Sequence, residues 1–585
     1  MRSQSVMKLL KNPIVWLGIL MISYNVITRL SKDNLKSVVF SDGSGYYAYL
    51  PSVFLYNDPT FLKSVEAENK YKGQDVNPIF IFKDKEGNFY NKYYPGIAIL
   101  QLPFFCIACL FSWLAGLPLT GYSDVFSFFY MLGSAFYSVA GIFLFYRFYR
   151  NLFPSLENSL KWIIPAFMVA TPLLSYCLET SYAHNFSFFL FGLFADQLFK
   201  LKTNHSLEKN YIIGVIIGLI VIVRPTNLII LLMVPFILGS KINFIQFLKS
   251  FFQDRSKPLF ALTLGFFSIF SLILLVWKWE SGNWFIWSYA GEGFNFLSPQ
   301  LFECLFGFRV GLFLQIPIMI ITVIGTYFLF KSNPFRFVIW FIYFSSLIWI
   351  FASWWCWDFY STFGSRAYTE HLFFLLIPIV SLFSNYRKFV LIALCFFVLT
   401  GAIRFLELKT GYMHNQRFTK ENYFESLLFW KKENKGRWNC TKACKPFGTK
   451  IMSKKLLNEP NILKIGANDE FIYPVETVLK KPRTNERFYY KVQLEKKLIN
   501  SQKTENVYLV ADLWNKDGTK RSYISTELFI DKYEGVDNWA KISLEGELLD
   551  NLQEFDFIKM YIWNQSRSKL YIKNVTFCLE QFKSK

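Results

Sequence analysis

Residues 41–58 read SDGSGYYAYLPSVFLYND and follow shortly after the first long apolar run of the chain, Pro13–Leu30. That run is long enough to cross a bilayer, begins after Lys8 and Lys11, and has no small-residue cleavage motif. It therefore predicts an uncleaved signal anchor with its N-terminus in the cytoplasm. The acid, the glycines and the tyrosines of the quoted stretch are then expected just outside the membrane.

Composition indicates a membrane protein of many spans. The 585 residues are 53% hydrophobic and 20% aromatic, which is too apolar for a single soluble core. Ten further runs of spanning or near-spanning length lie at residues 124–147, 162–179, 185–199, 210–223, 226–240, 258–277, 309–330, 335–352, 367–383 and 387–404. The fold class predicted from these runs is a polytopic α-helical membrane protein with about eleven transmembrane helices.

Residues 93–116 form one more apolar stretch, and counting it as a span would reverse the sidedness of every later loop. Without it, the basic residues between Arg147 and Lys388 gather mainly in the loops assigned to the cytoplasm, as the positive-inside rule requires. We therefore predict a membrane-dipping helix at 93–116, inside a first external loop of residues 31–123. The membrane domain is predicted to comprise residues 1–404, with its last helix ending outside.

The remaining sequence changes character. Residues 405–455 are Lys-rich with amphipathic pieces and are predicted to be a linker. Residues 456–585 show period-two alternation broken by turn signals, which predicts an extracytoplasmic antiparallel β-sandwich, jelly-roll-like in class. Trp514, Trp539 and Trp563 are candidates either for stacking on carbohydrate or for the sandwich core. Cys440 and Cys444 are equally compatible with a disulfide and with free thiols.

The formal net charge of +21 is carried largely by cytoplasmic loops and the external domain. No nucleic-acid-binding motif is visible, so anionic membrane lipids or glycolipids are the expected partners. No phosphate-binding glycine loop occurs in a cytoplasmic loop, which argues against a nucleotide-sugar donor bound inside.

The predicted topology places the unusual polar residues of the membrane domain at its outer face. They are Asp42, Lys92, His184, Asn185, Arg224, Arg309, Asp358, Arg366 and Glu370. Snorkelling explains any single cation, and pairing with Arg366 is the plainer interpretation of Asp358 and Glu370. Their convergence nevertheless favours a functional site. Cations there would hold a lipid-borne phosphate, while Asp42 would be the general base for a hydroxyl acceptor.

Other residues of the opening stretch have plainer interpretations. Gly43 and Gly45 are predicted to form a flexible turn that lets Asp42 face the site. The tyrosines that follow them are predicted to be interface anchors at the start of a surface helix, with stacking on a sugar as the alternative. Asp58, just before Pro59, is predicted to cap a helix or turn, with a catalytic role as the alternative.

These motifs resemble the C-type glycosyltransferase (GT-C) fold, which includes protein mannosyltransferases and lipid A aminoarabinose transferases. The resemblance covers about residues 1–404 and rests on six pieces of sequence. They are SDGSGYYAYLPS at 41–52, KYYPG at 92–96, the TP…SYAHNFSFF segment at 171–189, RPTN at 224–227, GFRVGLF at 307–313 and FGSRAY at 363–368. More narrowly, the chain resembles a bacterial group with D-G-x-G-Y-Y-A-Y-L-P after the first helix.

The resemblance implies roles for individual residues. Asp42 would be the catalytic base and, as in some members, would help to hold a divalent metal, Mg or Mn. Lys92, Arg224, Arg309 and Arg366 would bind the donor phosphate. His184, Asn185, Asp358 and Glu370 would orient the substrates.

The function so predicted is transfer of a sugar from a polyprenyl-phosphate carrier to a glycolipid, polysaccharide or protein at the outer face of a bacterial inner membrane. One alternative enzyme is a surface-polysaccharide polymerase or ligase with a lipid-diphosphate donor. Another class is a lipid-linked glycan transporter or a non-catalytic glycan-binding membrane protein.

Overall fold

The computed structural model describes most of the chain. In the N-terminal part it covers residues 12–410, apart from 31–33, 74–77, 79, 85, 204–205, 253, 290–291 and 360–362. Beyond that it covers residues 412, 423–424, 449–465, 469–478, 486–498, 507–517, 521–527, 540–547, 555–564 and 570–583.

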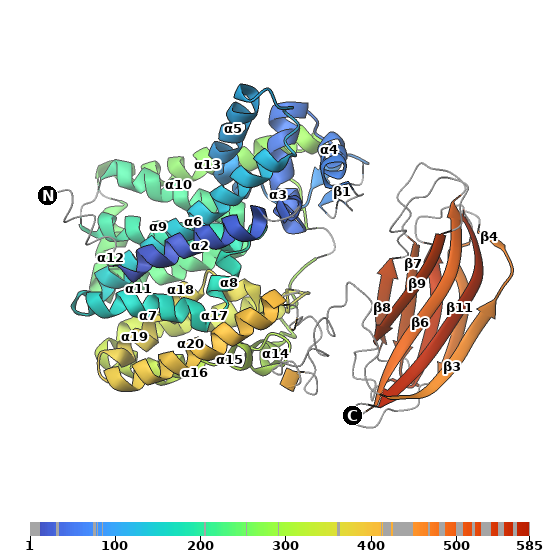
Figure 1. Cartoon of the computed structure of the whole chain (residues 1–585). Helices are drawn as coiled ribbons and strands as arrows, with labels where there is room; N and C mark the ends of the chain where they lie inside the picture. Colours follow the sequence, from blue (N-terminus) through green and yellow to red (C-terminus); the bar gives the residue numbers. More distant parts are fainter. Residues whose placement is uncertain are drawn as a thin grey trace. The chain divides into compact units, whose positions relative to one another are not determined.

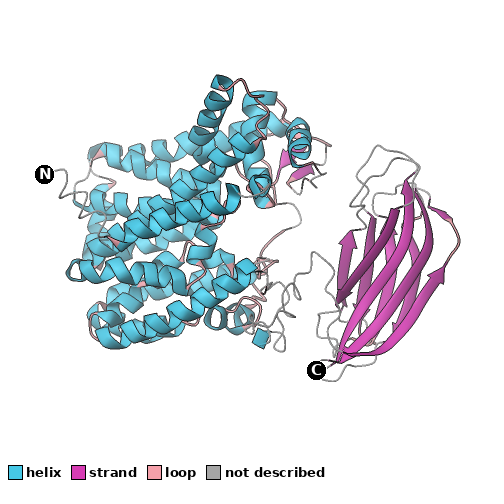
Figure 2. Ribbon diagram, in the orientation of Figure 1, coloured by secondary structure: helices cyan, strands magenta, loops and turns pink. Residues whose placement is uncertain are grey.

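The chain divides into two compact units, Met1–Leu406 and Glu407–Lys585. The described part of the first unit is helical except for one short pair of strands, and the second unit is built of strands (Figure 2). Helix α20 continues to Thr410 and strand β3 begins at Thr449, so regular structure extends into both ends of the predicted linker.

Six described helices are long and apolar enough to cross a membrane, which makes the first unit a multi-span membrane domain. They are α2 (Pro13–Leu30), α5 (Gly96–Leu114), α6 (Asp124–Leu152), α13 (Lys257–Ser281), α17 (Pro334–Ser353) and α20 (Arg387–Thr410). Helix α5 occupies the predicted dipping stretch. Its length and composition qualify it as a span, so its sidedness stays a prediction.

Several other predicted spans are shorter or interrupted, and the count of eleven stays a prediction. Prolines such as Pro172, Pro225 and Pro317 lie at several of the breaks, since proline removes a backbone donor and clashes with the preceding turn. The break between α11 and α12 instead falls at Gly239, which has φ +90°. The elements are α7 (Glu157–Ala170), α8 (Leu173–Cys177), α9 (His184–Thr203), α10 (Leu207–Val223), η4 (Pro225–Met233), α11 (Val234–Leu238), α12 (Lys241–Ser250), α15 (Leu312–Gln315), α16 (Met319–Ser332), α18 (Leu372–Leu375) and α19 (Ile377–Phe383). The segment made of η4 and α11 meets α12 at 116°.

The helices pack through small residues and apolar rings, as expected where lipid removes the hydrophobic drive between them. Figure 1 shows α10 beside α13 and α2 along α6. A Cβ atom at Gly214 of α10 would lie 2.0 Å from the carbonyl oxygen of Leu262 in α13. Close backbone contact of this pair therefore depends on the missing side chain.

The described part of the segment between α2 and α5, predicted to be an external loop, is folded. Its elements are η1 (Asn34–Ser37), α3 (Asp42–Pro51), η2 (Ser52–Tyr56), α4 (Leu62–Lys72) and the antiparallel pair β1 (Ile81–Lys83) and β2 (Phe89–Asn91). Asp58 accepts hydrogen bonds from the Thr60 amide at 3.0 Å and the Lys63 amide at 2.8 Å, which confirms it as a cap at the start of α4.

The second unit contains two antiparallel sheets. One has the order β5-β10-β7-β8, and the other has the order β3-β11-β6-β9 with β4 also paired to β11. The strands are β3 (Thr449–Glu459), β4 (Leu463–Ile465), β5 (Phe471–Val478), β6 (Glu486–Leu498), β7 (Val507–Trp514), β8 (Arg521–Glu527), β9 (Ala540–Glu547), β10 (Phe557–Asn564) and β11 (Leu570–Lys583).

The predicted period-two alternation is followed only in part, since Tyr489 of β6 is buried as well as its neighbours Phe488 and Tyr490. In β6 the alternate residues Phe488, Tyr490, Val492 and Leu494 are buried, and they share one apolar core with Ile558 and other residues of the opposite sheet. Buried apolar side chains on the facing sides of the two sheets therefore hold the sheets together.

The predicted tryptophans differ in setting. Trp563 of β10 stacks on Phe471 of β5 with ring centroids 6.4 Å apart, and its indole N–H donates to Glu470 at 3.3 Å. Trp514 ends β7, where it is paired with Phe557 in register. Trp539, Cys440 and Cys444 lie outside the described residues.

Candidate active site

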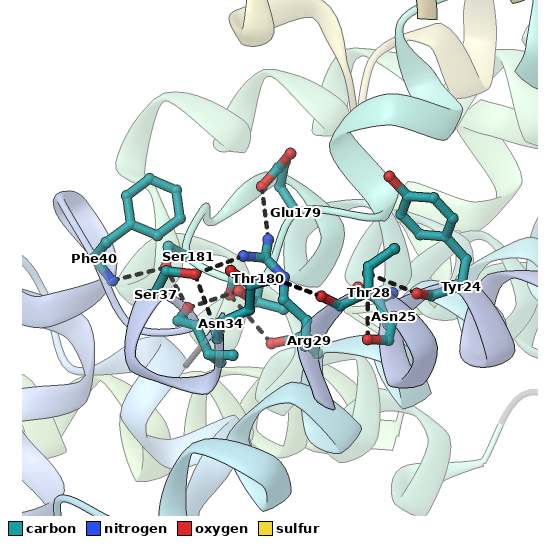
Figure 3. Close-up of polar contacts among 12 residues, drawn as sticks. Tyr24, Asn25, Thr28, Arg29, Asn34, Ser37, Phe40, Glu179, Thr180 and Ser181 are labelled. Carbon is teal, nitrogen blue, oxygen red and sulfur yellow. Dashed lines mark hydrogen bonds and ion pairs between the residues drawn. The ribbon is translucent and has the colours of Figure 1, made fainter. Parts of the chain in front are cut away.

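The backbone that leads into Asp42 is held by the segment before helix α9. The Phe40 amide donates to the Ser181 hydroxyl at 3.0 Å. The carbonyl of Val38 accepts from the hydroxyls of Ser181 and Thr180, each at 2.7 Å. These contacts join residues far apart in sequence (Figure 3).

A second part of the same network lies next to the membrane helix α2. Arg29, at the end of α2, contacts Glu179 at 3.5 Å and donates to the Ser37 hydroxyl at 3.0 Å (Figure 3). Asn34 donates to the Thr28 carbonyl at 2.9 Å. The turn between α2 and Asp42 is thus tied to both the preceding helix and the 179–181 segment.

Asp42 is the first residue of α3, and the residue before it is strained. Ser41 has φ +51° and ψ −129°, a conformation that non-glycine residues rarely adopt. Such strain persists only where the surroundings impose it, and it is common at functional sites. Here it turns the chain so that Asp42 opens the helix.

The predicted flexible turn at Gly43 and Gly45 is wrong, because both residues lie inside α3. A Cβ atom at Gly43 would lie 2.6 Å from Cβ of Ser181, and one at Gly45 would lie 2.4 Å from the Tyr93 ring. Glycine is required here for close packing and not for flexibility.

The tyrosines of α3 are also not the interface anchors that were predicted. Tyr46, Tyr47 and Tyr49 are buried. The Tyr49 hydroxyl donates to the Tyr93 carbonyl at 2.6 Å, and the rings of Tyr46 and Tyr93 are 4.7 Å apart. These rings pack the helix against the entrance to α5, since buried tyrosines combine a large apolar ring with a polar tip that needs a partner.

Both oxygens of the Asp42 carboxylate have partners. Oδ1 accepts from the Tyr93 hydroxyl at 2.8 Å, and Oδ2 lies 3.2 Å from the guanidinium of Arg366. Burial raises the pKa of this carboxyl, but Arg366, the Tyr93 hydrogen bond, Lys92 and Arg224 together outweigh burial and hold the pKa below its ordinary value. Asp42 is therefore ionised at neutral pH.

Arg366 is held in place from a second direction. Its guanidinium lies over the ring of Tyr182, 4.9 Å from the centroid. Tyr182 belongs to the segment that follows Ser181, so one stretch of chain supports both partners of the Asp42–Arg366 pair.

A second charged group lies where α9, α10 and the turn before α18 meet. His184 contacts Glu370 through Nδ1 at 2.7 Å, and Arg224 lies 3.0 Å from the same nitrogen. Arg224 is also 3.5 Å from the Glu370 carboxylate. The structure thus brings three predicted site residues into one cluster, and Arg224 is close enough to Asp42 to lower the pKa of that carboxyl.

Lys92 forms a third charged pair that the sequence analysis did not include. Its ammonium contacts Glu292 and lies 5.3 Å from the ring centroid of Tyr289. Glu292 is the first acid after Glu280, in the segment that follows α13, and the reasoning that selected Asp358 could have selected it.

The ion pairs differ from the plainer interpretation of Asp358 and Glu370. Neither forms its identified pair with Arg366, whose carboxylate partner is Asp42. Asp358 lies 3.2 Å from Arg309, and Glu370 pairs with Arg224. Closeness in sequence did not identify these partners, because Arg309 lies in the turn before α15 and Arg224 directly after the end of α10.

Asn185 lies next to His184 in sequence but faces another helix. It is fully buried, and its amide donates to the Ser134 carbonyl of α6 at 3.3 Å. This contact holds α9 against α6.

The residues around Asp42 do not fit a metal site. Both carboxylate oxygens already face Tyr93 and Arg366. Within the described ranges, no three His, Cys, Asp or Glu side chains come together as ligands.

Comparisons with known proteins identify no family for this chain. No family model matches the sequence, and neither does any curated protein. The cryo-EM structure of arabinosyltransferase EmbB from Mycobacterium smegmatis aligns with 93% of this chain at 10% identity and a TM-score of 0.29. The chain spans 64% of the length of EmbB. A score this low does not establish a shared fold.

Proposed function

We propose that the protein is a membrane glycosyltransferase that moves a sugar from a polyprenyl-phosphate carrier to an acceptor hydroxyl. The observation that carries this proposal is the contact of the Asp42 carboxylate with Arg366 at 3.2 Å. Lys92 and Arg224 also help to lower the pKa of that carboxyl. A base next to a group of cations suits a reaction in which a hydroxyl loses a proton and a phosphate leaves.

In the proposed reaction the acceptor oxygen attacks the anomeric carbon and its proton passes to Asp42. The bond from that carbon to the phosphate oxygen breaks, and the electron pair leaves with the polyprenyl phosphate. Arg366 and Arg224 stabilise the charge that develops on this phosphate. A single displacement inverts the anomeric centre.

Arg366 also links donor binding to the strength of the base. While Arg366 contacts Asp42, this cation holds the pKa of Asp42 down and so weakens Asp42 as a base. A donor phosphate that takes over the guanidinium would remove part of that effect and raise the pKa of Asp42. The base would then be strongest when the donor is in place.

We place the reaction at the outer face of a bacterial inner membrane, with the N-terminus in the cytoplasm and the second unit outside. The distribution of basic residues along the loops supports this arrangement. The acceptor class is an envelope glycolipid, polysaccharide or protein. In the second unit, the paired rings of Phe471 and Trp563, with Phe471 exposed, support a role in holding a glycan.

The test uses purified full-length protein and polyprenyl-phosphate carriers bearing labelled mannose, glucose or arabinose. Asp42→Asn should reduce formation of free polyprenyl phosphate by roughly 10²–10⁴-fold, the usual contribution of a general base. Asp84→Asn is the matched control, since it makes the same chemical change in the turn between β1 and β2 and retains the oxygen that accepts from the Glu86 and Asn88 amides. Full activity of Asp42→Asn would remove Asp42 as the base.

Transport is distinguished by the fate of the carrier. Vesicles that move the intact lipid-linked sugar across the bilayer without cleaving it would favour a transporter. Mass spectrometry of surface glycans from a deletion strain would identify the missing sugar and its acceptor.

A further inference from the structure

Helix α4 carries a buried ion pair that takes no part in the proposed chemistry. Glu68 is 1% exposed, and its carboxylate contacts the ammonium of Lys72 one turn later. Burying opposite charges is costly unless further hydrogen bonds satisfy them. The groups that supply those bonds here belong to the backbone and the helix on either side of Asp42.

Each member of the pair reaches the chain around Asp42. The Ser44 hydroxyl donates to Glu68 at 2.9 Å, and the Lys72 ammonium donates to the Val39 carbonyl at 2.8 Å. Val39 precedes Asp42 and Ser44 follows it, so the ion pair bridges the two sides of the residue. The strained Ser41 lies between these two attachment points.

Helix α4 is itself attached to the start of α6. Ser64 and the Tyr122 hydroxyl are 2.8 Å apart, and the Tyr71 hydroxyl donates to Asp124 at 2.7 Å. Asp124 is the first residue of α6. The pair therefore connects the Asp42 segment to a long membrane helix through a short external one.

The same segment is held on its other side by Thr180 and Ser181. Those hydroxyls contact Val38 and Phe40, whereas Glu68 and Lys72 contact Ser44 and Val39. Two attachments from different elements restrict a short segment more than one can, because one attachment leaves rotation about the contact free.

We propose that Glu68 and Lys72 are positioning residues that hold Asp42 in its contact with Arg366 and Tyr93. The role of Asp42 as base rests on the proposed function, whereas the restraint that Glu68 and Lys72 place on residues 39–44 does not. Neither residue is expected to touch the substrate.

The experiment compares Glu68→Ala, Glu68→Gln and Ser44→Ala in detergent-solubilised full-length protein. Amide hydrogen exchange of residues 38–45 should become about tenfold faster in Glu68→Ala, as expected for losing hydrogen bonds to a charged group. Glu68→Gln retains an oxygen for Ser44 and should be intermediate. Ser44→Ala removes only one hydroxyl, so its exchange rate at residues 38–45 tests the proposal if Glu68→Ala does not fold.

Sugar transfer supplies the second measurement. Glu68→Ala should lower kcat by about tenfold or more while KM for the donor stays nearly constant, since a displaced base slows chemistry and not binding. Its activity at about pH 5 relative to about pH 7.5 should also fall, because a carboxyl moved away from Arg366 protonates more readily. Glu66→Ala is the control, since it makes the same substitution at an exposed residue of α4, and it should leave both the exchange of residues 38–45 and kcat unchanged.

Unchanged exchange at residues 38–45 in Glu68→Ala and Ser44→Ala overturns the proposal. So does faster exchange with unchanged kcat and pH ratio in an active enzyme. The proposed function is overturned if the wild-type protein transfers none of the three sugars. If Glu68→Ala still speeds exchange of residues 38–45 in that case, the restraint by Glu68 and Lys72 is supported on its own.

Discussion

The guanidinium of Arg366 lies 3.2 Å from the carboxylate of Asp42, and it is supported from behind by the ring of Tyr182. The pair joins the start of α3 to the turn before α18. Because one partner is a candidate base and the other a candidate phosphate ligand, the contact makes the two proposed roles interdependent.

Replacing Arg366 should change the pH dependence of transfer. In the wild type, Arg366 and its neighbours keep the pKa of Asp42 low, so the carboxylate stays ionised at mildly acidic pH. In Arg366→Gln, burial raises that pKa, and activity should fall between about pH 7 and pH 5, where the wild type stays constant. Any stability from the Asp42–Arg366 pair is present above the unfolded pKa of Asp and is lost as pH falls through the folded value.

The measurement is kcat/KM against pH for wild type, Arg366→Gln and Arg366→Lys. The Lys variant keeps the charge and should retain a flatter profile than Gln. Parallel profiles for all three proteins would contradict the proposed influence of Arg366 on the base.

Removing Glu370 should mainly destabilise the protein. Its side chain is buried between His184 and Arg224, so Glu370→Gln leaves a cation without its carboxylate partner. Breaking a buried pair in this way costs about 3–5 kcal/mol. Glu179→Gln, at the more exposed pair with Arg29, should cost less than about 1 kcal/mol.

Thermal unfolding followed by exposure of buried cysteines would compare these two variants. The double variant Glu370→Gln/Arg224→Gln should recover part of the loss, because it removes the unpaired charge as well. Equal midpoints for Glu370→Gln and wild type would contradict the buried-pair interpretation.

A methyl group at Gly43 should displace Asp42. Its Cβ would lie 2.6 Å from Cβ of Ser181, so helix α3 or the 179–181 segment must shift. Misplacement of a catalytic group by about 1 Å can cost roughly a hundredfold in rate. We expect kcat of Gly43→Ala to fall by that order.

Gly87→Ala, in the turn between β1 and β2, is a suitable control. Gly87 has φ +89° and no neighbouring atom within 4 Å of an added Cβ, so alanine there strains the backbone without touching α3 or α4. It should lower stability modestly and leave kcat unchanged. A similar loss of kcat in both variants would indicate general loosening of the loop.

The pair of Lys92 and Glu292 should modulate donor affinity. Lys92→Met removes a charged donor of hydrogen bonds and should raise KM for the lipid-phosphate donor about tenfold. Glu292→Gln frees the ammonium and should lower KM severalfold. Lys83→Met, on strand β1, is the control for loss of an external lysine. An increase in KM for Glu292→Gln would mean that the carboxylate serves the site directly.

Labelling of introduced cysteines can determine whether α5 crosses the membrane. If it dips, Leu119→Cys, after α5, is accessible to an impermeant thiol reagent from outside, and Asn158→Cys, after α6, is protected. Both are measured against the unsubstituted protein in intact cells. The reverse pattern would mean that α5 is a full span.

Features that depend on local pattern can be predicted from the order of the amino acids. Apolar runs such as Lys257–Ser281 predict membrane helices because hydrocarbon admits only backbone that is internally hydrogen-bonded. Alternation in residues such as Phe488 to Leu494 predicts strands because successive side chains point to opposite faces. The charges in the loops likewise singled out Asp42 and its companions before any contact was known.

Which of these residues contact one another became visible only in the folded chain. It paired Asp42 with Arg366, Asp358 with Arg309, and Lys92 with Glu292. It also showed that Gly43 serves close packing, and it brought Glu68 of α4 to the residues around Asp42. The physical reason is that hydropathy and periodicity are properties of neighbours along the chain. An ion pair or a close approach depends on where distant segments meet, and no single segment encodes that.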